Sequence, residues 1–257
     1  LHDLHLEAED AINADQQLSK VALRIAVPVL PRTSNHTDFD ALRLQPDVDL
    51  QFVRKGQPLP PCDLIILPGS KSVRADLQAL HDNGWAEQLT RHLRYGGKVL
   101  GICGGFQMLG KLIHDPLGIE GPSGSSEGLA WLDMETTLAA EKTLRQVSGY
   151  CRLNGRQASL RGYEIHAGIS QGRALETPFA EVNEHCDGAI SADGHVLGSY
   201  VHGLFDDDEA RALILQWAGA SSLEAVDYDG IIEANLERLA DCVEQHLDME
   251  TLLSLGS

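Results

Sequence analysis

Basic residues are scarce in this sequence of 257 residues, in which 20 lysines and arginines stand against 38 aspartates and glutamates. The formal net charge of −18 argues against a nucleic-acid partner, because the phosphate backbone would be repelled. Long apolar runs are also absent: no segment approaches the roughly 18 consecutive apolar residues that a membrane-spanning helix needs. The sequence therefore predicts neither a nucleic-acid-binding protein nor a protein with a membrane partner.

Cysteine pairs with disulfide or metal-ligand spacing are missing as well. The five cysteines are odd in number, scattered and without a C-x-x-C pair: Cys62, Cys103, Cys151, Cys186 and Cys242. This pattern argues against a disulfide framework and against a zinc site, and it is typical of the reducing cytosol. We therefore expect a cytoplasmic protein that binds no metal.

A phosphate-binding loop is the third absence. The segment Pro68-Gly69-Ser70-Lys71-Ser72 lacks the first glycine and the spacing of G-x-x-x-x-G-K-[ST], and no other stretch supplies one. We therefore expect no nucleotide cofactor in this part of the protein.

What the sequence does contain is an alternation of strand-like and helix-like segments. Apolar runs predict strands over 21–29, 48–53, 63–67 and 99–102, and apolar spacing predicts helices over 38–44, 73–80 and 85–95. Further strand-like runs near 130–138, 143–153, 159–169, 179–184, 188–191 and 195–201 precede helices over 209–217 and 231–247. The pattern predicts an α/β fold with a doubly wound, mostly parallel sheet flanked by helices and an antiparallel extension in the second half. Ligands of such sheets bind at the carboxyl ends of the strands.

The stretch Gly101-Ile102-Cys103-Gly104-Gly105 predicts a sharp strand-to-helix turn with a cysteine at its apex. The glycines have no Cβ to clash, and apolar residues at helical spacing follow at Phe106, Leu109, Leu112 and Ile113. The free amides and the dipole of a helix N-terminus favour a thiolate, which is nucleophilic near neutral pH. Cys103 is therefore the candidate nucleophile, and a buried cysteine beside a glycine-rich turn is the alternative.

A cysteine nucleophile needs a base that can also protonate the leaving group, and an imidazole titrates in the right range. His202 follows the apolar run 196–201, so it could reach the same sheet edge as Cys103. His166 is the competing candidate, which we interpret as lining the pocket or forming an interface. A surface or structural role is the alternative for any of the eleven histidines.

Three further residues are candidates for binding the substrate. The backbone amide of Gly104 immediately follows the nucleophile, and that of Gly69 follows a proline at a strand end, so both could donate to a tetrahedral oxyanion. Gln107 lies one helical turn after Cys103 and could hydrogen-bond the amino-acid end of a substrate. A solvent-facing glutamine is the alternative there.

The segment Gly-Ile-Cys-Gly-Gly-Phe-Gln resembles the nucleophile motif of the triad-type, or class I, glutamine amidotransferases. A wider resemblance, to the amidotransferase domain of the cobyric acid synthase branch, rests on four motifs in the same order. They are Leu-Pro-Gly-Ser-Lys-Ser at 67–72, the motif around Cys103, Arg-Gly-Tyr-Glu-Ile-His-Ala-Gly at 161–168 and Tyr-Val-His-Gly-Leu-Phe-Asp at 200–206. Together they cover most of residues 22–206.

The resemblance implies that L-glutamine is hydrolysed at Cys103 and that the ammonia passes to a separate synthetase domain, which uses ATP and Mg²⁺. In this branch that domain amidates corrin-ring carboxylates of adenosylcobyrinic acid a,c-diamide in cobalamin biosynthesis. It normally precedes the amidotransferase domain, and the chain here begins with Leu1 and a polar, acidic segment. We therefore expect residues 1–20 to be a linker from a missing N-terminal synthetase domain, and residues 21–257 to be a weakly active amidotransferase domain.

One position departs from the wider family. Most triad-type amidotransferases carry a glutamate two residues after the histidine, where this sequence has Leu204. The same absence is typical of the cobyric acid synthase branch. Asp206 and Glu164 are possible orienters of the imidazole, and a Cys–His pair without a carboxylate is equally possible.

Two other functions are compatible with these motifs. The chain could be the amidotransferase subunit of a complex that amidates lipid II of the cell wall, with a murein ligase as its partner. It could also be a non-catalytic docking module on the same fold, against which the intact Cys103, His202 and Gly69 argue.

Overall fold

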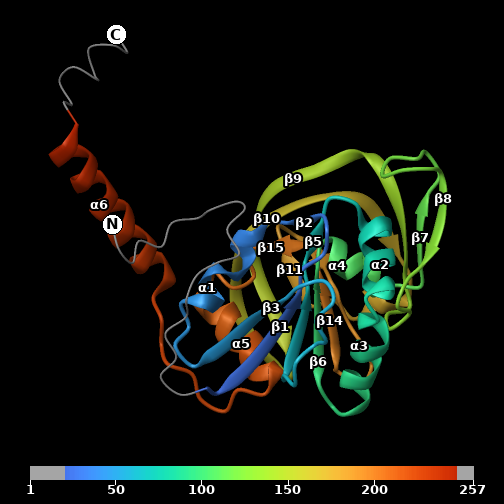
Figure 1. The fold of residues 1–257 in the computed structure, drawn as a ribbon, viewed down its shortest axis with the longest axis horizontal. Helices are drawn as coiled ribbons and strands as arrows, with labels where there is room; N and C mark the ends of the chain where they lie inside the picture. The colour runs from blue at the N-terminus through green and yellow to red at the C-terminus, as the bar shows by residue number, and fades with distance from the viewer. Residues whose placement is uncertain (1–20, 248–257) are drawn as a thin grey trace, which may run out of the picture.

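The computed structural model describes residues 21–247, so the linker predicted over residues 1–20 lies outside the described residues (Figure 1). A six-stranded sheet forms the first layer, and its strands are parallel apart from β13 at one edge. In spatial order these strands are β13 (Ala189–Ile190), β14 (Val196–Ser199), β6 (Lys98–Ile102), β4 (Leu64–Leu67), β1 (Leu23–Pro28) and β3 (Val48–Val53). The predicted doubly wound, mostly parallel sheet is confirmed.

Both faces of this sheet are buried, which explains why its central strands are continuous apolar runs. All four residues of β4 are buried, and alternate side chains of β1 enter two different cores. One core contains α2 (Val73–Asp82), α3 (Trp85–Arg94) and the short α4 (Gly104–Met108). The other contains η1 (His36–Phe39), α1 (Asp40–Arg43) and α5 (Asp208–Ala218). The helices therefore cover both faces, as a doubly wound sheet requires.

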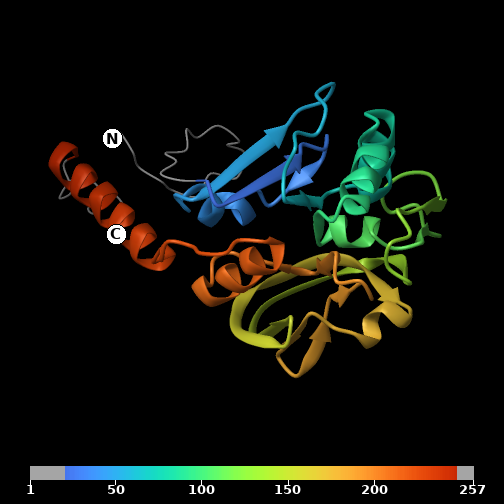
Figure 2. The same ribbon diagram turned by 90° about the horizontal axis from the view of Figure 1, so that it is seen from below.

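The antiparallel strands of the second half form a sheet of their own, which packs into the second core and lies below the parallel sheet in Figure 2. Its main feature is a long hairpin of β9 (Glu135–Leu153) and β10 (Arg156–Gln171), joined by an Asn154-Gly155 turn with φ values of 52° and 73°. Both residues of a type I′ turn need positive φ, and Asn-Gly is its preferred sequence. The other strands are β7 (Leu112–Asp115), β8 (Gly124–Glu127), β11 (Ala180–Val182), β12 (His185–Asp187) and β15 (Val201–His202).

Two predictions about local structure are wrong. The apolar spacing predicts Leu112 and Ile113 on the helix after Cys103, but α4 ends at Met108 and both residues lie on β7. The chain leaves the helix at Gly110, where a Cβ would come within 2.8 Å of the Met134 carbonyl, and Lys111 then pairs with that carbonyl. The strands expected near 130–138 and 143–153 are one strand, β9, which continues through the polar residues between them.

Three smaller elements complete the described chain: the two-stranded pair β2 (Thr33–Ser34) and β5 (Gly69–Ser70), the short η2 (Arg173–Glu176), and the terminal helix α6 (Tyr228–His246). Helix α6 stands away from the body in both views (Figures 1 and 2). No helix in the described part of the chain is long and apolar enough to cross a membrane.

Candidate active site

Cys103 occupies the bend between β6 and α4 at the carboxyl edge of the parallel sheet. Its own backbone carries the strain, with φ 51° and ψ −106°, a region that residues with a Cβ rarely adopt. Gly105 permits the bend because a Cβ there would lie 2.2 Å from the Leu67 carbonyl oxygen on the neighbouring strand. The amide of Cys103 donates to the Ser199 carbonyl at 2.8 Å, and Sγ lies 3.4 Å from the Ile165 carbonyl. The sulfur is thus held at the apex of the bend, with 7% of the residue exposed.

His202 reaches the same place from the other sheet. It ends β15, which pairs with β10, and its ring stacks on Tyr163 with the centroids 5.3 Å apart. Nδ1 lies 2.7 Å from Oδ2 of Asp38, and the other oxygen of Asp38 accepts the Gly203 amide at 2.8 Å. Because an ionised carboxylate can only accept, Nδ1 carries a proton and Nε2 remains for proton transfer. Nε2 makes no hydrogen bond within residues 21–247.

The carboxylate that orients His202 is therefore Asp38, and the prediction of Asp206 or Glu164 is wrong for the Nδ1 bond. Glu164 accepts from Arg145 at 2.6 Å and lies 2.9 Å from Nε2 of His185. It follows Tyr163 on β10, and successive side chains of a strand point to opposite faces, so Glu164 points away from His202. The Asp206 carboxylate lies beside Gly203, within 2.8 Å of where a Cβ would be.

The electrostatics of His202 favour its charged form. Burial alone would lower the pKa of this imidazole, but the negative charge and hydrogen bond of Asp38, together with nearby Cys103, raise the pKa to about 10. A protonated imidazole beside Cys103 stabilises a thiolate and can later protonate a leaving group. This arrangement suits a cysteine nucleophile paired with a histidine acid.

A cavity of about 290 Å³ opens in front of the sulfur. Its walls come from the loop after β1, from the β5–α2 turn, from α4, from the segment before β8 and from the β9–β10 hairpin. The lining residues are Ser34, Asn35, Ser70, Lys71, Val73, Cys103, Gly104, Gln107, Glu120, Lys142, Ile165, His166 and Ala167. Neither Lys71 nor Lys142 has a side-chain hydrogen bond or ion pair within the described residues, so both ammonium groups are available to a ligand.

Gln107 and His166 lie on one wall of this cavity. Gln107 is only 2% exposed, and its side-chain amide donates to the Ala167 carbonyl and to the Tyr200 hydroxyl, each at 3.3 Å. His166 stacks on Tyr200 with the ring centroids 4.0 Å apart, and burial lowers its pKa, so its ring is neutral near pH 7. The position of His166 agrees with a lining residue, while the base beside Cys103 is His202.

The two predicted oxyanion donors lie on either side of the reacting groups. Gly104 lines the cavity directly after Cys103, and a Cβ on it would lie 2.9 Å from the Ser70 amide nitrogen. Gly69 lies against His202, because a Cβ there would come within 3.1 Å of Cε1 of the imidazole. The structure thus brings Cys103, His202, Gly104, Gly69 and Gln107 to one site.

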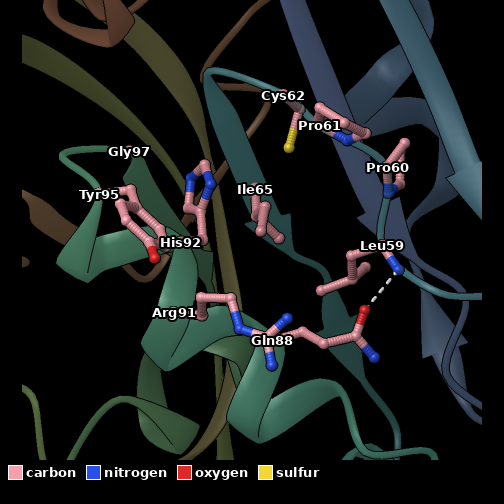
Figure 3. A pocket seen from close by; sticks show the side chains of 10 residues that line it. All are labelled: Leu59, Pro60, Pro61, Cys62, Ile65, Gln88, Arg91, His92, Tyr95 and Gly97. Atoms are coloured by element: carbon pink, nitrogen blue, oxygen red, sulfur yellow. Dashed lines mark hydrogen bonds between the residues drawn. The ribbon is translucent and has the colours of Figure 1, made fainter.

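A second cavity, of about 390 Å³, lies at the opposite end of β4 and contains Cys62 (Figure 3). Burial and the charge of Asp63 raise the pKa of the Cys62 thiol to about 12, and burial likewise raises the pKa of the Cys151 thiol to about 12. Both are therefore protonated near neutral pH and are poor nucleophiles. Within the described residues no group of three or more metal-binding side chains forms a metal site.

The missed residue, Asp38, lies 164 positions before His202 in the sequence. It falls in a short polar turn that no local motif marks, and only the packing of that turn against β15 brings the two side chains together. The left-handed conformation of Asn35, with φ 54°, starts the turn and leads the chain into η1. The Asn-X-X-Asp spacing at the carboxyl end of a predicted strand is the only available signal.

Fold and site together define an α/β protein with a cysteine, a histidine and an aspartate gathered at the carboxyl edge of a doubly wound sheet. Residues 24–210 match the family model described as the CobB/CobQ-like glutamine amidotransferase domain. The chain belongs to this family, and it is therefore a glutamine amidotransferase domain.

Solved structures agree at the level of the fold. PurLQS from Thermotoga maritima is 17% identical with a TM-score of 0.54, over 84% of this chain and 99% of that one. A glutamine amidotransferase is 21% identical with a TM-score of 0.56, over 76% and 98%. A putative GMP synthase protein from Thermoplasma acidophilum is 15% identical with a TM-score of 0.51, over 85% and 98%.

Proposed function

We propose that this domain hydrolyses the side-chain amide of L-glutamine with Cys103 as the nucleophile. The Cys103 thiolate attacks the amide carbon, and the tetrahedral intermediate collapses with cleavage of the C–N bond while His202 transfers its Nε2 proton to the leaving ammonia. Water then attacks the thioester, His202 takes up one of its protons, and glutamate leaves with the thiolate restored. The backbone amides of Gly104 and Gly69 are the proposed donors to the oxyanion of both intermediates.

The charged groups of the cavity would hold the amino-acid end of glutamine. Lys71 and Lys142 supply two ammonium groups for the α-carboxylate. Glu120, whose carboxylate accepts the Arg74 amide at 3.4 Å, supplies a negative charge for the α-ammonium. Gln107 adds a polar wall on the same side as Cys103. A substrate with both charges is thereby distinguished from a simple amide.

The single observation that carries this proposal is the convergence of Cys103 and the Asp38-bound His202 on one cavity. The test is a glutamine analogue with a diazoketone in place of the amide, followed by mass spectrometry of the tryptic peptide 99–111, which contains Cys103 as its only cysteine. We expect covalent modification of this peptide that excess L-glutamine prevents and that H202N slows. Labelling of Cys186 instead, or labelling that glutamine does not prevent, would contradict the proposal.

We further propose that the released ammonia serves an ATP- and Mg²⁺-dependent synthetase domain, and that the whole enzyme is a cytoplasmic cobyric acid synthase amidating corrin-ring carboxylates. The four sequence motifs support this branch, and the CobB/CobQ-like family match is consistent with it. Exposed apolar side chains beside the cavity offer a docking surface for such a domain: Leu144 is 72% exposed and pairs across the hairpin with Ile165, which is 36% exposed.

The test is amidation of a corrinoid a,c-diamide by the full-length protein that carries this domain, with ATP, Mg²⁺ and either glutamine or ammonium as nitrogen source. We expect the C103A variant to lose amidation from glutamine and to keep amidation from ammonium. Amidation of lipid II in place of the corrinoid would contradict the assignment to this branch.

A further inference from the structure

The two catalytic side chains come from different sheets: Cys103 from the parallel sheet and His202 from the antiparallel one. The distance between them therefore depends on how the sheets are joined. One crossing of the chain between the sheets runs from β12 to β13 through Asp187 and Gly188, and another runs from β14 to β15 through Tyr200. Both crossings lie next to Cys103, because Ser199 pairs with Ile102 on β6.

The side chain of Asp187 connects these two crossings. Its Oδ2 accepts the hydroxyl of Ser199 at 2.5 Å, and its Oδ1 accepts the amide of Tyr200 at 3.0 Å. The Ser199 hydroxyl in turn accepts the Val201 amide at 3.1 Å, so three consecutive residues of the second crossing are tied to one carboxylate. All of these groups are buried, with 4% of Asp187 and none of Ser199 exposed.

The same short segment contacts both catalytic residues. The carbonyl of Ser199 accepts the amide of Cys103 at 2.8 Å, and the chain reaches His202 three residues later. We propose that Asp187 is a positioning residue for the amidase reaction, which clasps the β14–β15 crossing so that His202 arrives within proton-transfer reach of Cys103. This inference rests on the proposed function of the site and adds a residue that touches neither substrate nor reacting atoms.

The chemistry of Asp187 fits this role. Burial raises its pKa to about 6, against the opposing effect of the hydrogen bonds from Ser199 and Tyr200. The carboxylate is therefore ionised near neutral pH and can accept both bonds at once. Hydrogen bonds to a charged acceptor are stronger and shorter than neutral ones, which suits a clasp between two layers.

Burying a carboxylate is costly, so a role in stability alone is a weak explanation for it. The D187N substitution would keep the size of the side chain, but its amide could accept only one of the two donors well. The expected displacement of the crossing is a fraction of an ångström, and Asp38 would still bond to His202. The variant should therefore fold and lose rate rather than substrate affinity.

The experiment compares D187N and S199A with D193N as matched control. Asp193, at the far end of β14, also accepts a serine hydroxyl and a backbone amide, at 2.6 Å from Ser191 and 3.1 Å from His195, but it is remote from Cys103. For D187N we expect kcat for glutamine to fall about 10- to 100-fold with little change in KM, as for a small misplacement of a catalytic group. S199A, which keeps the carboxylate and its bond to Tyr200, should lose less, and D193N should match the wild type.

A second readout does not depend on glutamine: the rate of Cys103 alkylation by iodoacetamide at pH 7, followed on peptide 99–111. We expect the same order of variants in this rate, because the imidazole next to the sulfur controls its reactivity. If the wild type lacks glutaminase activity but the alkylation order holds, the proposed function fails and the role of Asp187 stands. Equal rates in D187N and wild type, or an equal loss in D193N, would overturn it, and S199A decides in the same way if D187N does not fold.

Discussion

His202 is fixed on two sides, by the Asp38 carboxylate at 2.7 Å from Nδ1 and by the Tyr163 ring stacked on its face. Asn35 donates to the Tyr163 hydroxyl at 2.9 Å, so the turn that supplies Asp38 also holds the stacking ring. The imidazole therefore has one orientation and one tautomer before any substrate arrives. Such preorganisation lowers the cost of reaching the transition state.

Substitution D38N tests the role of this carboxylate. The amide keeps the shape but removes the charge that holds the imidazole in its protonated form, so kcat for glutamine hydrolysis should fall about 10²- to 10⁴-fold. The matched comparison is D206N, for which we expect a change in kcat below about threefold. Steady-state kinetics of both variants decide, and a larger loss in D206N than in D38N would refute the assignment of Asp38.

The lysines of the cavity make a separate prediction at the same scale. Loss of one ammonium group from K142A or K71A should raise KM for glutamine about 5- to 20-fold and leave kcat nearly unchanged, because the α-carboxylate is bound equally in ground and transition states. K55A is the control, since Lys55 is exposed and lies outside the cavity. A fall in kcat at constant KM would contradict a binding role for these lysines.

At the scale of elements, the turn around Cys103 combines a strained cysteine with glycines that allow close approach. The central strands and α2, α3 and α5 follow local apolar patterns, and the family motifs point to Cys103 and His202 before any fold is considered. Asp38 and Asp187 cannot be found in this way, because each acts on residues of another sheet and has no neighbour in sequence that marks it. The full length of β9 is missed for a different reason: its central residues are polar and exposed, and only pairing with β10 makes them extended.

Substitution G105A tests the close approach directly. A Cβ at this position would lie 2.2 Å from a backbone oxygen of β4, which cannot move as a flexible side chain could. We expect the free energy of unfolding to fall by about 3 kcal/mol or more, at or above the upper end for overpacked positions. G56A is the control: nothing lies within 4 Å of its Cβ, and its cost should be about 1 kcal/mol from the left-handed backbone alone. Denaturant unfolding of both variants measures the difference, and equal losses would contradict the steric argument.

At the scale of the whole molecule, the charged His202 links catalysis to stability. The pKa of His202 is about 10 in the folded protein and about 6.5 in an unfolded chain, so folding favours the protonated form. The stabilisation is complete below pH 6.5 and is lost as the pH rises towards 10. Between pH 7 and 10 the free energy of unfolding should therefore fall more steeply in the wild type than in D38N, by an amount on the order of 1–3 kcal/mol. Urea unfolding at several pH values measures this, with H202Q as the control that removes the titrating group. If all three proteins showed the same slope, His202 would not be charged in the folded state, and the proton proposed for the leaving ammonia would have to come from another group.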